Sequence, residues 1–112
     1  MIMADEQNFF HISEIEQKRK LSGNRYHEFL RVPALSAGVY VLAAGATDPQ
    51  KPHGEDEVYY VIRGRARMRI GDEEQAVSSG SVVFVGAQVE HRFLDITEEL
   101  VVLVFFAPEE SS

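Results

Sequence analysis

Short runs of β-branched and aromatic residues recur through most of this sequence, and glycine-containing stretches separate many of them. The runs cover residues 26–31, 38–42, 58–62, 66–70, 75–77, 82–85, 91–95 and 100–106. Runs of this length bounded by turn residues are typical of β-strands. About eight short strands in one chain pack as a sandwich or a small barrel. The sequence therefore predicts an all-β fold for this chain of 112 residues.

Apolar residues alternate with arginines over residues 63–70. This period of two predicts a strand with one face buried and the other in water. We interpret the arginines as a solvated strand face paired with nearby carboxylates and not as a nucleic-acid site. Tight turns at residues 71–72 and 78–81 predict that three strands follow one another as hairpins.

One short helix is expected near the N-terminus, from Ser13 to about Leu21. Ser13 followed by Glu16 has the form of a capping box, and Gly23 stands where a helix-ending glycine belongs. Both ends of the chain are polar, and we expect them to fray.

Charge and cysteine content narrow the functions open to this chain. It has 11 basic and 18 acidic residues, so its formal net charge of −7 repels phosphate backbones. No apolar run is long enough to span a bilayer and the N-terminus lacks the features of a signal peptide, so we expect a cytoplasmic protein without membrane or nucleic-acid partners. Without cysteine, a metal site must use histidine, carboxylate and amide ligands. A chain of 112 residues with a hydrophobic content of 45% can bury one core, so we expect a single domain over residues 1–112.

Potential metal ligands gather in a polar stretch directly before the strand expected from Val58. On one straight strand, His53 and Glu57 would lie about 13 Å apart and could not share an ion. Gly54 allows the chain to turn between them. We therefore expect His53 to end one strand and Glu57 to begin the next, facing back toward His53.

His91 is a third candidate ligand, at the expected start of another strand. Two imidazoles and one carboxylate suit Fe(II), Mn(II), Ni(II) or Zn(II), and three protein ligands leave coordination positions for water or substrate. The residues alone also allow a plainer interpretation, in which both histidines are ordinary surface or hydrogen-bonded side chains and Glu57 is a solvated carboxylate.

Two sets of spaced residues resemble the conserved motifs of the cupin superfamily. The first set is Gly45, His53, Glu57 and Gly64, and the second is Gly80, Gly86, Gln88, His91 and Asp95. The resemblance implies a small RmlC-like cupin, a double-stranded β-helix or jelly-roll barrel with its core at about residues 26–106. It also implies that His53, Glu57 and His91 bind a divalent transition metal, one of Fe, Mn, Ni or Zn.

The sequence departs from the family where the first metal-binding histidine would stand, because it has Lys51 there. A lysine ammonium has no lone pair for a metal. Gln50 would supply an amide oxygen instead if Pro49 and Pro52 turn position 50 inward. Both arrangements remain open, and Gln50 joins the candidate ligands.

The expected barrel interior and the metal site together suggest a function. By strand alternation, Tyr59, Val61 and Phe93 point inward, together with Tyr40 or Val41. The leading hypothesis is a protein that binds a small organic molecule at the metal and transforms it by dioxygenase-, isomerase- or lyase-type chemistry. The alternative is a non-catalytic sensor or storage module with a structural metal or none.

A homodimer is also expected. Residues 100–106 are apolar on both faces, as in a strand between two packed layers or at a subunit interface. The N-terminal segment adds Phe9, Phe10 and Ile12, which would cover a neighbour's sheet.

Overall fold

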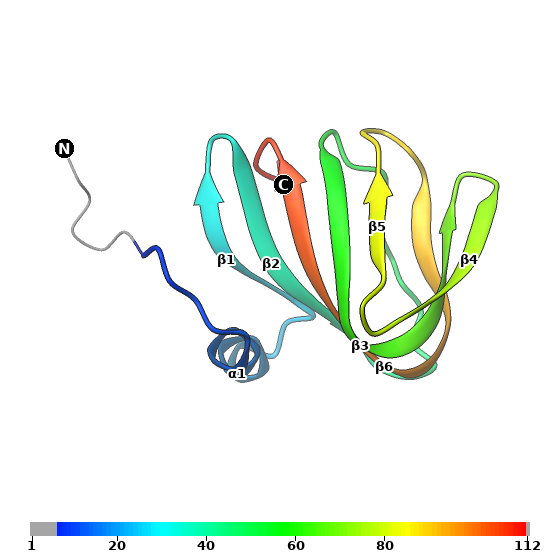
Figure 1. Cartoon of the computed structure of the whole chain (residues 1–112), viewed down its shortest axis with the longest axis horizontal. Helices are drawn as coiled ribbons and strands as arrows, with labels where there is room; N and C mark the ends of the chain where they lie inside the picture. Colours follow the sequence, from blue (N-terminus) through cyan, green and yellow to red (C-terminus); the bar gives the residue numbers. More distant parts are fainter. Residues whose placement is uncertain (1–6, 112) are drawn as a thin grey trace.

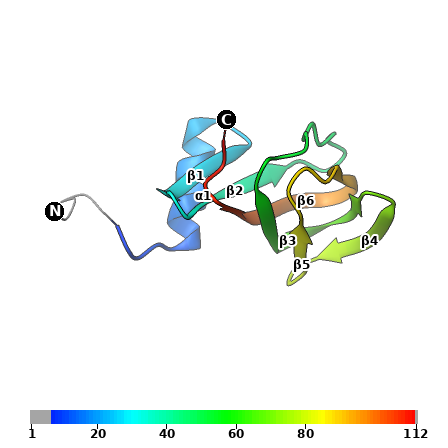
Figure 2. The ribbon, with the colours of Figure 1, turned by 90° about the horizontal axis from the view of Figure 1, so that it is seen from above.

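The computed structural model describes residues 7–111. Within that range it has one helix and six strands: α1 (Ile12–Ser22), β1 (Tyr26–Val32), β2 (Leu35–Leu42), β3 (Asp56–Ile70), β4 (Glu73–Ser78), β5 (Val82–Val85) and β6 (His91–Ala107). The strands pair antiparallel in the order β1-β2-β6-β3-β4, and β5 pairs separately with β3. They curve around one interior (Figures 1 and 2). The expected all-β barrel with one short helix is confirmed.

Two long strands replace four of the short strands that the sequence predicts. Residues 58–62 and 66–70 both belong to β3, and residues 91–95 and 100–106 both belong to β6. The two long strands pair with each other over most of their length, so they form the spine of the barrel.

A bulge at Gly64 explains why β3 looks like two strands in the sequence. The pairing register of β3 with β6 shifts between Val61 and Arg67, which bends the strand without ending it. Gly64 has a φ of 106°, and a Cβ atom there would lie 2.2 Å from the Glu99 carbonyl oxygen. The glycine that suggests a strand boundary is therefore the bend of a continuous strand.

The bend also changes the expected order of hairpins. The turn at residues 71–72 joins β3 to β4 as predicted. The predicted second hairpin is wrong, because β4 and β5 do not pair with each other: β4 pairs with residues 65–70 of β3 and β5 with residues 57–60. Since the two halves of β3 point in different directions, the chain crosses from one to the other between β4 and β5.

Helix α1 begins one residue earlier than predicted and with a different cap. The N-cap is His11, whose Nδ1 accepts a hydrogen bond from the Ser13 backbone N–H (3.1 Å). The predicted capping box is therefore wrong, and Glu16 pairs with Arg63 of β3 instead. Gly23 ends the helix in the left-handed conformation (φ 75°), as predicted.

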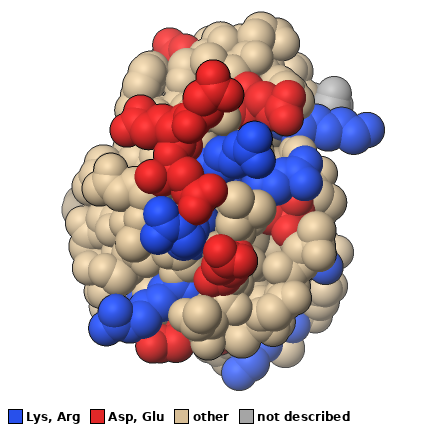
Figure 3. Space-filling view, turned by 90° about the vertical axis from the view of Figure 1, so that its right-hand side faces the viewer, with Lys and Arg blue, Asp and Glu red and all other residues tan. Residues whose placement is uncertain are grey.

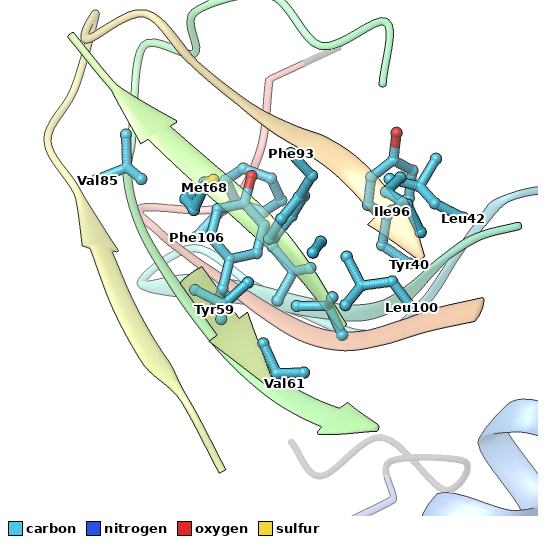
Figure 4. Packing of buried hydrophobic residues seen from close by; sticks show 14 residues of the cluster. Tyr40, Leu42, Tyr59, Val61, Met68, Val85, Phe93, Ile96, Leu100 and Phe106 are labelled. Atoms are coloured by element: carbon cyan, nitrogen blue, oxygen red, sulfur yellow. The ribbon is translucent and has the colours of Figure 1, made fainter. Parts of the chain in front are cut away.

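Apolar side chains form two clusters, one on each side of the sheet. Figure 4 shows the cluster inside the barrel, which includes Tyr40, Leu42, Tyr59, Val61, Met68, Phe93, Leu100 and Phe106. The other joins Ile15 of α1 to Val39, Val41 and Val101 of the sheet. Figure 2 shows α1 beside β1 and β2. The inward orientation of Tyr59, Val61 and Phe93 is confirmed. Tyr40, and not Val41, faces the interior.

The N-terminal apolar residues contact their own chain. Phe10 and Ile12 pack against the cluster under α1, while Phe9 is 88% exposed. The expectation that all three cover a neighbour is therefore wrong for Phe10 and Ile12. The homodimer itself stays a prediction.

The arginines of β3 pair largely with carboxylates, as predicted. Acidic and basic side chains are interspersed on the face at the right of Figure 1 (Figure 3). The ion pairs are Arg63–Glu16, Arg65–Glu98 and Arg67–Glu74.

The C-terminal residues 108–111 fold back onto the barrel, so the expected fraying is wrong for this end. The Glu110 backbone N–H donates to Ser36 Oγ (2.8 Å), and the Glu110 carbonyl oxygen accepts from Arg31 (2.8 Å). Residues 1–6 and Ser112, also expected to fray, lie outside the described residues. No helix in the described part of the chain is long and apolar enough to cross a membrane.

Candidate metal centre

The four candidate ligands come from three parts of the chain. His53 and Gln50 lie in the connection between β2 and β3, Glu57 is the second residue of β3, and His91 is the first residue of β6. Residues 43–55 form no strand, so the expectation that His53 ends a strand is wrong. A loop and two strand starts therefore contribute the candidate side chains.

Two hydrogen bonds join the loops that carry the two motifs. The Gln88 backbone N–H donates to the His53 carbonyl oxygen (2.6 Å), and the Ala87 backbone N–H donates to Asp56 Oδ1 (2.8 Å). These contacts tie the loop before β3 to the loop before β6. They place His53 near His91 although neither loop has regular structure.

His53, Glu57 and His91 come together in space. One potential ligand atom from each residue lies within 4.8 Å of the others. Glu57 is 1% exposed and His91 is 3% exposed, while His53 is partly buried. The structure therefore groups two imidazoles and a carboxylate, a set of ligands that suits a divalent transition metal.

The hydrogen bonding of His91 directs one ring nitrogen toward Glu57. His91 Nδ1 lies 2.9 Å from the Val89 carbonyl oxygen, which can only accept, so Nδ1 carries the hydrogen. The neutral ring then has its lone pair on Nε2. Nε2 lies 3.1 Å from Glu57 Oε1. Burial lowers the pKa of His91, but the Glu57 carboxylate and the Val89 carbonyl outweigh burial and raise it overall.

Glu57 is a buried carboxylate without hydrogen-bond donors. Neither of its oxygens has a hydrogen-bond partner among residues 7–111, and the 3.1 Å contact with His91 lacks hydrogen-bond geometry. A buried charged acceptor without a partner is costly. Carboxylate oxygens facing an imidazole lone pair form an arrangement that a cation between them would stabilise.

Gln50, and not Lys51, has its side chain beside His91. Gln50 Oε1 accepts a hydrogen bond from the Tyr59 hydroxyl (2.7 Å) and lies 3.3 Å from His91 Nε2. Burial raises the pKa of Tyr59 well above its usual value, so its hydroxyl stays neutral and can donate. Lys51 is exposed. The amide oxygen therefore lies beside His91, one of the three grouped candidate ligands.

Asp48 orients Gln50, and sequence reasoning missed this role. Asp48 is 1% exposed and accepts hydrogen bonds from the Tyr40 hydroxyl (2.7 Å), Gln50 Nε2 (2.8 Å) and the Phe93 backbone N–H (2.9 Å). Because a carboxylate only accepts, it fixes the amide with its NH₂ group toward Asp48 and its oxygen toward His91. No local pattern marks this aspartate, since two of its partners lie on other strands.

A cavity of about 190 Å³ adjoins the cluster. Three of the four candidate ligands line it, Gln50, His53 and Glu57, together with Lys51 and with aromatic and apolar side chains such as Tyr26, Val104 and Phe106. Glu110 from the C-terminal segment also borders it, with a carboxylate oxygen 3.7 Å from His53 Nδ1. Burial raises the pKa of Glu110, and the other nearby glutamates add to this effect while His53 opposes it.

The sequence is similar to known proteins over most of its length. Residues 38–106 match the cupin-domain family. An uncharacterised protein of Streptomyces coelicolor is 49% identical over 102 residues, which are 91% of this chain and 97% of that protein.

Solved structures share the fold. An RmlC-like cupin from Shewanella frigidimarina has a TM-score of 0.68 and 19% identity, over 74% of this chain and 74% of that one. The DMSP lyase DddQ from Ruegeria pomeroyi has a TM-score of 0.66 and 21% identity, over 74% of this chain and 47% of that one. At these identities the likeness shows the fold alone.

Proposed function

We propose that this chain, which belongs to the cupin family, binds one divalent transition-metal ion and holds a small organic molecule beside it. The proposed protein ligands are His53, Glu57, His91 and Gln50. The observation that carries the proposal is the buried Glu57 carboxylate, which has no hydrogen-bond partner among residues 7–111 and lies 3.1 Å from His91 Nε2. A metal ion satisfies both groups at once.

Gln50 is the proposed fourth ligand in place of a histidine. Its oxygen is directed toward His91 because Asp48 accepts from its NH₂ group. The Tyr59 hydroxyl uses one lone pair of that oxygen, and the second remains for a metal. Lys51 is exposed to solvent, although it also lines the neighbouring cavity, so water can screen its ammonium charge.

The neighbouring cavity is the proposed place of the organic ligand. Such a metal, when bound, acts as a Lewis acid with open positions for ligand oxygens. The chain itself contributes an apolar and aromatic wall, which excludes water from one side of the ligand. Dioxygenase-, isomerase- and lyase-type reactions are compatible with this arrangement, and the fold selects none of them.

Metal analysis of purified protein tests the proposal. Wild-type protein incubated in turn with Fe(II), Mn(II), Ni(II) and Zn(II) should retain one ion per chain for at least one metal. His91→Ala and Glu57→Gln should lose it, and His27→Ala on β1, outside the cluster, serves as the matched control. Full occupancy in His91→Ala, or a wild type that binds none of the four ions, would overturn the assignment.

Catalysis is tested separately from binding. The metal-loaded protein is assayed for oxygen consumption and product formation with small diketones, phenols and thiols. Turnover that disappears in Glu57→Gln supports an enzyme, whereas ligand binding without turnover supports the alternative of a non-catalytic sensor or storage module.

A further inference from the structure

Buried polar side chains fasten the C-terminal segment, residues 108–111, to the rest of the chain. Ser36 of β2 is fully buried, and its Oγ accepts a hydrogen bond from the Glu110 backbone N–H (2.8 Å). Glu55, in the loop before β3, is 6% exposed and accepts from Ser111 Oγ (2.8 Å). These anchors lie on both sides of the Glu110 side chain, so its starting point is fixed.

The Glu110 side chain reaches the cavity and His53. It lines the cavity together with His53 and Glu57, and its Oε2 lies 3.7 Å from His53 Nδ1. This distance is longer than a hydrogen bond, so the contact is electrostatic, and a small side-chain rotation would close it. A carboxylate in this place favours the ring hydrogen on Nδ1 over one on Nε2.

The cations near Glu110 leave its carboxylate to His53. Arg31 donates to both carboxylate oxygens of Glu28 (3.0 and 2.9 Å) and meets Glu110 only at the backbone carbonyl oxygen. Among residues 7–111, Glu110 forms its ion pair with His53 and not with Lys51, which is exposed and lines the same cavity. The other nearby glutamates repel the charge of Glu110. An N–H donor beside this carboxylate is therefore stabilising.

His91 shows what such a contact does for an imidazole of the site. The Val89 carbonyl oxygen takes the Nδ1 hydrogen (2.9 Å), which leaves the lone pair of the His91 ring on Nε2. The loop that carries His53 is held by the backbone N–H of Gln88, which donates to the His53 carbonyl oxygen (2.6 Å). That bond fixes the main chain and leaves the ring tautomer open. Glu110 offers the His53 ring the acceptor that Val89 offers the His91 ring.

We propose that Glu110 is a positioning residue of the metal centre: its carboxylate accepts the Nδ1 hydrogen of His53 and so leaves the Nε2 lone pair for the metal. The inference rests on the proposed function, because it takes His53 as a metal ligand. It also gives the C-terminal segment a role, since the anchors of this segment hold the carboxylate beside the ring. Loss of such a partner weakens metal binding by about 10–100-fold in metal sites generally.

Nitrogen-15 NMR of the metal-free protein tests the contact itself, because the ring nitrogen shifts distinguish the two neutral tautomers. The spectra are recorded at about pH 8, above the usual imidazole pKa. Wild-type His53 should carry its hydrogen on Nδ1. Glu110→Gln should keep this tautomer, because its amide oxygen still accepts, whereas Glu110→Ala should shift the hydrogen to Nε2.

A metal titration against a competing chelator tests the consequence, with whichever of the four ions the wild type retains. Glu110→Ala should bind that ion at least about tenfold more weakly. Glu110→Gln should stay within about threefold of wild type, because it keeps the acceptor and loses only the charge. Glu109→Ala is the matched control, since it removes a glutamate from the same segment that does not line the cavity, and it should bind as wild type does.

The outcomes distinguish this inference from the function on which it rests. A wild-type ring with its hydrogen on Nε2, or a Glu110→Ala ring that keeps it on Nδ1, overturns the role of Glu110. So does a Glu110→Ala variant that binds metal as tightly as wild type. Equal losses in Glu110→Gln and Glu110→Ala also overturn it, because the carboxylate would then act by its charge alone. Each of these results leaves the metal centre intact, whereas a wild type that binds none of the four ions overturns the proposed function, and the inference with it.

Discussion

Replacing Asp48 should destabilise the fold in a way that depends on which hydrogen bonds the new residue keeps. Asp48→Ala leaves three donors without their acceptor: the Tyr40 hydroxyl, the Gln50 amide and the Phe93 backbone N–H. A buried donor that loses its acceptor costs at least about 1 kcal/mol. With three such donors, the variant should lose about 3 kcal/mol of unfolding free energy. For a domain of this length, that is a drop of about 12 °C in Tm.

Asp48→Asn is the informative partner variant. Its amide oxygen can still accept from Gln50 and Phe93, while its NH₂ group can donate to the Tyr40 hydroxyl oxygen. The charge is lost and the Tyr40 hydroxyl accepts instead of donating, so we expect a cost of about 1 kcal/mol, or about 4 °C in Tm.

Urea and thermal unfolding followed by circular dichroism measure both variants, with Glu98→Ala as a surface control expected within about 0.5 kcal/mol of wild type. Equal losses for Asp48→Asn and Asp48→Ala would refute the hydrogen-bond explanation. So would a loss below about 1 kcal/mol for Asp48→Ala.

Three other predictions concern the bend, the fourth ligand and the oligomer. Gly64→Ala should lower the free energy of unfolding, measured in urea, by at least about 2 kcal/mol, because alanine is strained at a φ of 106° and its Cβ would collide with β6. A variant as stable as wild type would contradict this. Gln50→Ala should weaken metal binding about tenfold in a titration, while Lys51→His should change it little; tighter binding by Lys51→His would show that position 51 faces the metal. Light scattering should give twice the chain mass of 12.6 kDa. The reason is that Tyr60 of β3 and Phe84 of β5 lie exposed on two paired strands and form an apolar face. A monomer mass at micromolar concentrations would refute the dimer.

The sequence predicts the strands well because each depends on a local pattern. The alternation over residues 63–70 and the turn at residues 71–72 are readable from neighbouring residues. The joining of short runs into β3 and β6 is not, because the bend at Gly64 depends on the approach of Glu99 from the opposite strand. A local pattern cannot distinguish a glycine that ends a strand from one that bends it.

Some residues of the candidate site can likewise be found from the local sequence, and others only from the three-dimensional structure. The sequence predicts His53, Glu57 and His91 as metal ligands because their residue types and spacing resemble a family motif. Asp48 could not be found in this way, because its role depends on contacts made in three dimensions: it accepts hydrogen bonds from Tyr40 of β2 and Phe93 of β6.

A crystal structure of the Zn(II)-loaded protein with anomalous diffraction data tests the central claim most directly. The account predicts one anomalous peak per chain, within about 2.0–2.2 Å of a nitrogen of His53, a nitrogen of His91 and an oxygen of Glu57. The Gln50 oxygen should be the fourth protein atom facing the peak. A peak elsewhere on the chain, or fully loaded protein with no peak between these three residues, would contradict the account.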